Sequence, residues 1–96
     1  MLTKRRIGAR DYSIHENGQP VGRIRYASER TPGVWTWSIT VALPGPPFGS
    51  ARSYDEARAA FKRAWEAFAA EQGRERLAKA FAEMAHASEK AQGPSK

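Results

Sequence analysis

The residues that could carry acid–base, nucleophilic or metal chemistry are few. The chain has two histidines, His15 and His86, and no cysteine, which excludes disulfides, thiolate nucleophiles and cysteine-ligated zinc. Glu83 and His86 have the Glu-x-x-His spacing of carboxylate metal sites, but such sites take ligands from several helices. A serine triad would need a shaped cleft beside one histidine, and no glycine-rich phosphate-binding motif is present. We therefore expect no enzyme activity, metal, cofactor or small-molecule substrate.

Basic and hydroxyl side chains suggest a different chemistry. The formal net charge is +6, and residues 1–27 hold six basic side chains against two acidic ones. Such a surplus favours anionic partners such as nucleic acid, although it also serves solubility. Donors of this kind contact phosphates and base edges. The candidate nucleic-acid contacts are Arg23, Arg25, His15, Thr36, Ser38, Thr40, Lys4, Arg5 and Arg6.

Most of these candidates fall in segments that alternate between polar and apolar residues. Residues 12–15, 21–27 and 34–41 show the two-residue period of strands. Glu16-Asn17-Gly18 predicts a hairpin, and a three-residue loop would place Tyr12 and Ile14 on one face with Ile24 and Tyr26. The opposite, open face would then collect the polar side chains. An antiparallel sheet with one wet face ordinarily carries such residues, so their presence alone does not require a ligand.

Two segments lack any strand pattern. Residues 1–11 are polar and basic without a period, which predicts a flexible arm whose Lys4, Arg5 and Arg6 either touch phosphates or stay solvated. Residues 43–50 contain three prolines. Proline provides no N–H donor for a ladder, so this segment is expected to be a loop.

The C-terminal half predicts helix. Ser53 and Glu56 have capping-box spacing, and Ala57, Phe61, Trp65 and Phe68 repeat at helical intervals, which predicts a helix over residues 54–70. We expect its apolar stripe to pack on the sheet, with Trp35 and Trp37 in the core.

A second apolar stripe follows Gly73. Leu77, Phe81 and Met84 lie roughly 140–200° around a continuous helix from Phe61. Either the helix breaks at Gly73 and folds back, or it continues and offers this stripe to another molecule. Glycine costs only about 1 kcal/mol within a helix, and no capping residue follows it. The sequence therefore favours a continuous helix and a homodimer interface at Leu77, Phe81 and Met84.

The predicted fold is α+β, a three-stranded antiparallel meander packed on one C-terminal amphipathic helix that is long and extended or broken at Gly73. The predicted organisation is a basic arm over 1–11, a sheet-plus-helix domain over 12–72, a helical extension over 73–90 and a disordered tail over 91–96. The lack of cysteine suits a reducing compartment, and no apolar run approaches the ~20 residues of a membrane span. We therefore expect a cytoplasmic protein with no membrane association.

Three segments carry a resemblance. They are Val21-Gly22-Arg23-Ile24, Trp35-Thr36-Trp37-Ser38-Ile39 and the stretch from Ser53 through Phe61 to Trp65. Together they resemble a set of short uncharacterised bacterial proteins with G-R-I, W-x-W-S-I and S-x-[DE]-E-A-[KR]-x-x-F motifs. This resemblance spans residues 21–68 and implies no activity. The order of elements is also similar to the DNA-binding domains of plant ethylene-response factors and integrase arm-binding domains, which insert the open sheet face into the major groove.

These observations favour a non-enzymatic binding module that contacts nucleic acid through the basic open sheet face and the arm. The alternative is a protein-interaction or homodimerisation module that uses the C-terminal helix.

Overall fold

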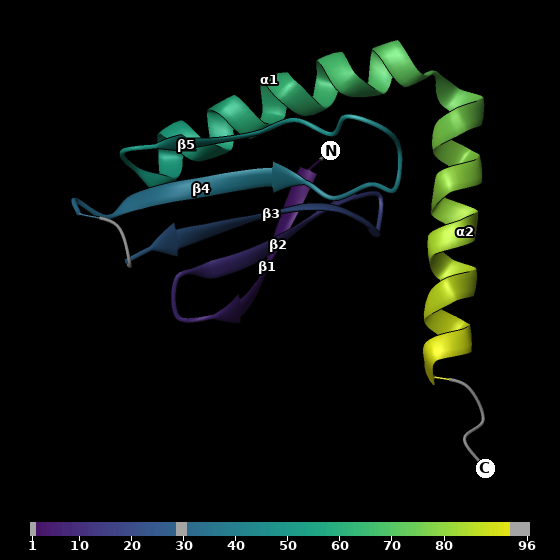
Figure 1. Ribbon diagram of the computed structural model, residues 1–96, viewed down its shortest axis with the longest axis horizontal. Coiled ribbons are helices and arrows are strands. Elements are labelled where there is room, and N and C mark those ends of the chain that lie inside the picture. The colour runs from purple at the N-terminus through teal and green to yellow at the C-terminus, as the bar shows by residue number, and fades with distance from the viewer. Residues whose placement is uncertain (1, 29–30, 93–96) are drawn as a thin grey trace.

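A computed structural model describes residues 2–28 and 31–92, which form a five-stranded antiparallel sheet followed by two helices (Figure 1). The strands pair in sequence order as a meander. Helix α1 lies over one face of the sheet, and α2 bends from the end of α1 and runs alongside one end of the strands (Figure 1). The α+β class is confirmed, but with five strands and two helices rather than three and one. The bounds are β1 Leu2–Gly8, β2 Asp11–Glu16, β3 Gln19–Ala27, β4 Val34–Ile39, β5 Phe48–Ala51, α1 Tyr54–Gln72 and α2 Arg74–Gln92.

The basic segment at the start of the chain is an edge strand, so the expected flexible arm over 1–11 is wrong. Strand β1 pairs with β2, placing Lys4 opposite Ile14, Arg5 opposite Ser13 and Arg6 opposite Tyr12. An edge strand has one hydrogen-bonded neighbour and often carries Lys or Arg, which discourage pairing with other chains. Charged residues therefore occupy both faces of β1, and the usual polar–apolar alternation does not appear.

The β2–β3 hairpin places the expected residues on one face, but with a different turn from the expected one. Its turn has two residues, Asn17 (φ 52°) and Gly18 (φ 82°), and Glu16 pairs with Gln19, so the expected three-residue loop is wrong. Positive φ at both positions is typical of a type I′ turn. A β-bulge then leaves Val21 without a partner on β2. This bulge shifts the register by one residue, so Tyr12 pairs with Ile24 and the expected common apolar face is confirmed.

Strand β5 lies in the segment expected to be a loop. Its four residues pair with β4, with Phe48 opposite Ser38 and Gly49 opposite Trp37. The last proline of this segment is Pro47, whose carbonyl oxygen accepts a hydrogen bond of 3.0 Å from the amide of Ile39. Residues after Pro47 again have N–H groups, so the proline argument holds only up to that point.

Helix α1 forms one side of the core, and the sheet forms the other. The Ser53 side chain accepts a hydrogen bond of 3.1 Å from the Glu56 amide, which caps the predicted start of the helix. Phe61, Trp65 and Phe68 are buried against the sheet. Close packing depends on Gly22, because a Cβ atom there would lie 2.3 Å from Phe61 Cε2. The main buried partners on the strands are Ile14, Val21, Ile24 and Ile39.

The helix breaks at Gly73, so the favoured continuous helix is wrong. Gly73 has φ 86° and ψ 159°, and its amide donates a 3.0 Å hydrogen bond to the Ala69 carbonyl. This backbone region is essentially restricted to glycine. The break lets α2 return toward the core, where Ala80 is only 2% exposed. The half-buried residues Leu77, Phe81 and Met84 pack against the same core.

The C-terminal limits also differ from the expectation. Residues 91 and 92 belong to α2, and the remainder of the expected tail, 93–96, lies outside the described residues. Within residues 2–28 and 31–92, neither helix combines the length and apolar character needed to cross a membrane.

Candidate functional site

The sheet face that α1 leaves uncovered carries two rows of side chains running across the strands. The strand register aligns one row from β1 to β5 and a second from β2 to β5. Strands lie about 4.8 Å apart, so the longer row extends about 19 Å. We call this surface, together with His15, the open face. Its rows are Arg5, Ser13, Arg23, Ser38 and Phe48, and then Asp11, Arg25, Thr36 and Ser50.

An ion pair ties the two rows together. Arg23 donates two hydrogen bonds to Asp11, with Nε–Oδ1 and Nη2–Oδ2 distances of 2.8 and 2.5 Å. The hydrogen bonding to Arg23, and to a smaller extent the charges of Arg23 and Arg25, hold the pKa of Asp11 below its ordinary value. The carboxylate is therefore ionised at neutral pH. It offsets part of the positive charge of the three arginines on this face.

Ser13 and His15 form the closest approach to a catalytic pair. Ser13 Oγ and His15 Nε2 lie 3.0 Å apart on the exposed side of β2. A nucleophile of this type also needs oxyanion donors. Strand β2 lies inside the sheet, so its amides are used in the ladders to β1 and β3. The pair therefore provides polar groups to a flat surface but lacks the neighbouring backbone donors of a hydrolase.

The candidate nucleic-acid contacts separate onto different surfaces. The open face contains Arg5, His15, Arg23, Arg25, Thr36 and Ser38. Thr40 lies beyond β4 and is exposed, and its amide donates a 2.9 Å hydrogen bond to the Val21 carbonyl.

Lys4 and Arg6 lie on the α1 side of the sheet. The Lys4 Nζ atom is 5.0 Å from the Tyr12 ring centroid and 4.8 Å from that of Tyr54. Arg6 lies opposite Tyr12 across the β1–β2 ladder. Because neighbouring residues of a strand point to opposite faces, only Arg5 of the three basic β1 candidates joins the open face.

Besides Ser13, three members of the open face were not among the sequence candidates, namely Asp11, Phe48 and Ser50. Asp11 fell within the supposed arm, and the other two within the supposed loop. The sequence holds a weak signal for β5, because Phe48-Gly49-Ser50-Ala51 follows Pro47 and contains no further proline to interrupt the N–H ladder.

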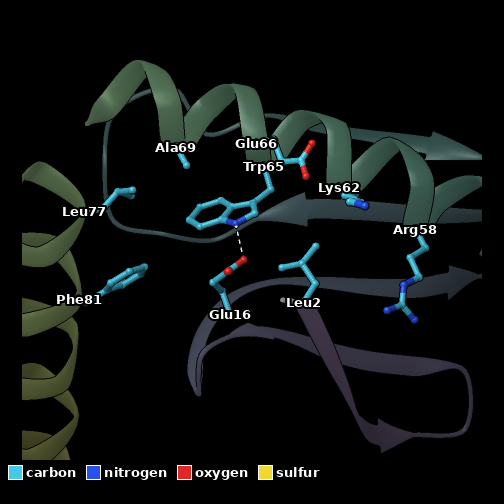
Figure 2. Close-up of a pocket in the computed structure, with 9 residues that line it drawn as sticks. All are labelled: Leu2, Glu16, Arg58, Lys62, Trp65, Glu66, Ala69, Leu77 and Phe81. Atoms are coloured by element: carbon cyan, nitrogen blue, oxygen red, sulfur yellow. Dashed lines mark hydrogen bonds between the residues drawn. The ribbon is translucent and has the colours of Figure 1, made fainter. Parts of the chain in front are cut away.

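A second surface of interest is a groove between α1, α2 and the start of β1 (Figure 2). Its volume is about 750 Å³, and Trp65 lies at its centre with the indole N–H donating a 3.1 Å hydrogen bond to Glu16 Oε1. Leu77 and Phe81 line one end, and Arg58 and Lys62 project from α1 toward the other (Figure 2). Two of the three predicted interface residues therefore line this groove, whereas Met84 is not part of its lining.

Neither surface shows a metal centre. Among the side chains that the structure describes, no three of the His, Asp and Glu groups come together as metal ligands would. No family model, curated protein or solved structure matches this chain. Function is therefore inferred from the chemistry of these two surfaces.

Proposed function

We propose that this protein is a non-enzymatic nucleic-acid-binding module that uses the open face. The observation that carries the proposal is the row from Arg5 to Phe48, which crosses all five strands with cationic, hydroxyl and aromatic groups. Arginine binds phosphate in two-pronged geometry, and serine and threonine hydroxyls contact phosphates and base edges. A sheet face of this kind can lie against a nucleic acid without a preformed cleft.

The distribution of charge supports the same orientation. The basic excess belongs to the sheet, because β1 to β3 and their turns hold six basic and two acidic residues. Helix α1 instead carries three basic residues and four acidic ones, Asp55, Glu56, Glu66 and Glu71. Of the six basic residues, Arg5, Arg23 and Arg25 lie on the open face, whereas Lys4 and Arg6 lie on the α1 side. A polyanion is therefore attracted toward the sheet rather than toward α1 itself.

Within this interface, Arg5 and Arg25 are assigned to phosphate contacts. Both guanidinium groups belong to the open face, Arg5 at its outer strand and Arg25 beside Thr36. Arg23 is held by Asp11, so it has to exchange its carboxylate partner for a phosphate. The hydroxyls of Ser13 and Ser38 lie on either side of Arg23 and supply neutral donors and acceptors.

The test is the salt dependence of binding to short DNA and RNA oligonucleotides. We expect affinity to fall steeply as salt rises, because each neutralised phosphate releases counterions. Replacing both Arg5 and Arg25 by Ala should reduce the magnitude of the log–log salt slope by between about 1.4 and 1.8. Fluorescence anisotropy at several salt concentrations measures this slope directly.

The matched control removes the same charge from the other side of the molecule. Arg58→Ala with Lys62→Ala lowers the net charge equally but changes α1, so affinity should fall slightly while the slope stays near that of the wild type. If the two double variants behave alike, binding reflects net charge alone and the open face is not the interface. If the wild type binds neither duplex nor single strands at low salt, the proposed function is wrong.

A second candidate is a homodimerisation module that uses the groove. It is favoured by Leu77 and Phe81, which remain half-exposed at one end of the groove. In this case a second copy would cover both residues, and the wild type would sediment as a dimer at micromolar concentration. The candidate has less support because the same residues already pack on their own core.

A further inference from the structure

Phe48 is the most exposed large apolar side chain of the described residues, with 80% of its surface accessible. It begins β5 directly after Pro46-Pro47 and lies opposite Ser38 on the open face. The hydrogen bond between the Ile39 amide and the Pro47 carbonyl fixes the backbone just before it. The ring is therefore presented to solvent from a strand rather than from a free loop.

The surroundings of Phe48 distinguish it from an ordinary exposed apolar residue. It borders a shallow hollow of about 420 Å³ whose other walls include Arg25, Thr36, Ser38 and Ser50. The Thr36 hydroxyl donates to the Arg25 carbonyl at 3.3 Å and keeps its lone pairs as acceptors. An aromatic residue, three hydroxyl-bearing residues and an arginine thus border a single small space.

Gly49 seats β5 closely against the core on the other side of the sheet. A Cβ atom at Gly49 would lie 2.8 Å from Trp37 Cζ2, so the chain runs directly against the indole ring. Trp37 in turn packs edge-on against Phe61 of α1, with ring centroids 6.2 Å apart. The strand that carries Phe48 is therefore seated on the core, and stacking on the exposed ring would require little rearrangement.

We propose that the hollow binds an unpaired nucleobase stacked on Phe48, which makes single-stranded nucleic acid the ligand of the open face. This inference rests on the proposed function and specifies its ligand. Bases of a duplex have their ring faces covered by their neighbours, whereas an unstacked base can lie on an aromatic side chain and offer its edge to hydroxyl groups. The nucleic-acid chain then crosses the β-sheet toward the phosphate contact at Arg5.

The experiment compares single-stranded DNA, single-stranded RNA and duplex DNA of the same sequence, using the wild type, Phe48→Ala and Phe48→Tyr. The wild type should bind both single strands more tightly than the duplex. Phe48→Ala should lose about tenfold or more on the single strands, as expected for one stacked base. Its salt slope should not change, because no phosphate contact is removed, and Phe48→Tyr should keep wild-type affinity because the ring remains.

Ile7→Ala is the control, since Ile7 is another exposed apolar residue of the sheet, 54% accessible, on β1. It should leave single-strand binding unchanged. Equal binding of duplex and single strands, with Phe48→Ala unaffected, would overturn the stacking inference but leave the nucleic-acid function standing. A wild type that binds none of the three oligonucleotides would overturn both.

Discussion

Asp11 is a restraining group within the open face. Its carboxylate takes both hydrogen bonds of the Arg23 fork, so this guanidinium is oriented along the sheet. About half of the Arg23 side chain remains accessible, and exposed pairs of this type contribute at most about 1 kcal/mol to folding. A phosphate can therefore compete for Arg23 at modest cost. Under the proposed function, the pair would affect the phosphate affinity of this surface more than the stability of the fold.

We predict that Asp11→Asn tightens binding of oligonucleotides several-fold at low salt. The substitution removes a negative charge from the interface and leaves Arg23 free to bind phosphate in its two-pronged geometry. Titrations at a fixed salt concentration measure the change. Glu66→Gln on α1 removes the same charge from the other side of the molecule and should have a much smaller effect; equal effects would show that the Asp11 carboxylate has no local role.

Acid titration of Asp11→Asn shows whether the ion pair also forms in solution. Folding lowers the pKa of Asp11 from its ordinary value of 3.8, so its contribution to stability is complete above that value. The contribution is lost as pH falls through the lower, folded-state pKa. The difference in Tm between wild type and variant should therefore shrink as the pH is lowered below 3.8.

Sequence patterns located most of the open face but not all of its members. Alternation in β3 and β4 was sufficient to place Arg23, Arg25, Thr36 and Ser38 together. The absence of a period in residues 1–11 predicts an arm on which Lys4 and Arg5 act together, whereas the strand places them on opposite faces. Side chains on both faces of an edge strand can reach solvent. Polar and apolar residues therefore need not alternate along it.

At the scale of elements, three sequence segments meet at one contact. Gly22 on β3 admits the ring of Phe61 on α1, and Trp37 on β4 packs edge-on against the same ring. These residues belong to the segments with the G-R-I, W-x-W-S-I and S-x-[DE]-E-A-[KR]-x-x-F patterns. Helix-to-sheet packing accounts for much of the residue pattern in these segments, and Arg23 and Ser38 are the members that point to the open face.

We predict that Gly22→Ala strongly destabilises the protein. The added Cβ atom would lie 2.3 Å from Phe61 Cε2 and 2.4 Å from the Ser38 carbonyl oxygen. The ring could move, but the backbone oxygen belongs to the β3–β4 ladder, so both α1 and the sheet would have to shift. Overpacking of this kind costs about 1–3 kcal/mol or more, and chemical denaturation measures it.

Gly8→Ala is the matched control for this substitution. Its Cβ atom would meet only Asp11 Cβ, at an ordinary contact distance of 3.4 Å, so stability should change little. If the two glycine variants unfold at the same denaturant concentration, the close approach of α1 to Gly22 does not occur in solution.

The elements found from the sequence were those with a strong internal pattern. Helix α1 has a capping residue and a buried stripe, and β3 and β4 alternate clearly. Strand β5 has four residues, too few to display a period, and its identity depends on pairing with β4. The β2–β3 bulge is equally a product of tertiary structure, since it satisfies both the two-residue turn and the apolar face.

For the whole molecule, the break at Gly73 decides where the second apolar stripe goes. The sequence placed Leu77 and Phe81 on the opposite side of a continuous helix from Phe61, and that geometry would be correct without the break. Local propensity favoured continuity, because one glycine costs little within a helix. The break buries Ala80 and half-buries three apolar neighbours. This apolar burial stabilises the folded chain more than the helical hydrogen bonds lost at Gly73 would.

We predict that Gly73→Ala shifts the chain toward a continuous helix and a larger species. Alanine is strained at φ 86° and ψ 159°, whereas it is the most favourable residue within a helix. Straightening would expose Leu77, Phe81, Ala80 and Met84, a patch that a second straightened chain can cover. Sedimentation at micromolar concentration should give a greater mass than that of the wild type, with helix content undiminished in circular dichroism.

Gly45→Ala separates this effect from backbone strain alone. Gly45 also has a positive φ, 70°, but lies in the exposed loop before β5. Its substitution should lower Tm without changing the mass of the protein in solution. If Gly73→Ala likewise only lowers Tm and keeps the wild-type mass, the contacts of α2 with the core are strong enough to hold the bend against the strain. The second stripe would then be committed to the fold of a single chain, and an interface between two copies at the groove would lose its main support.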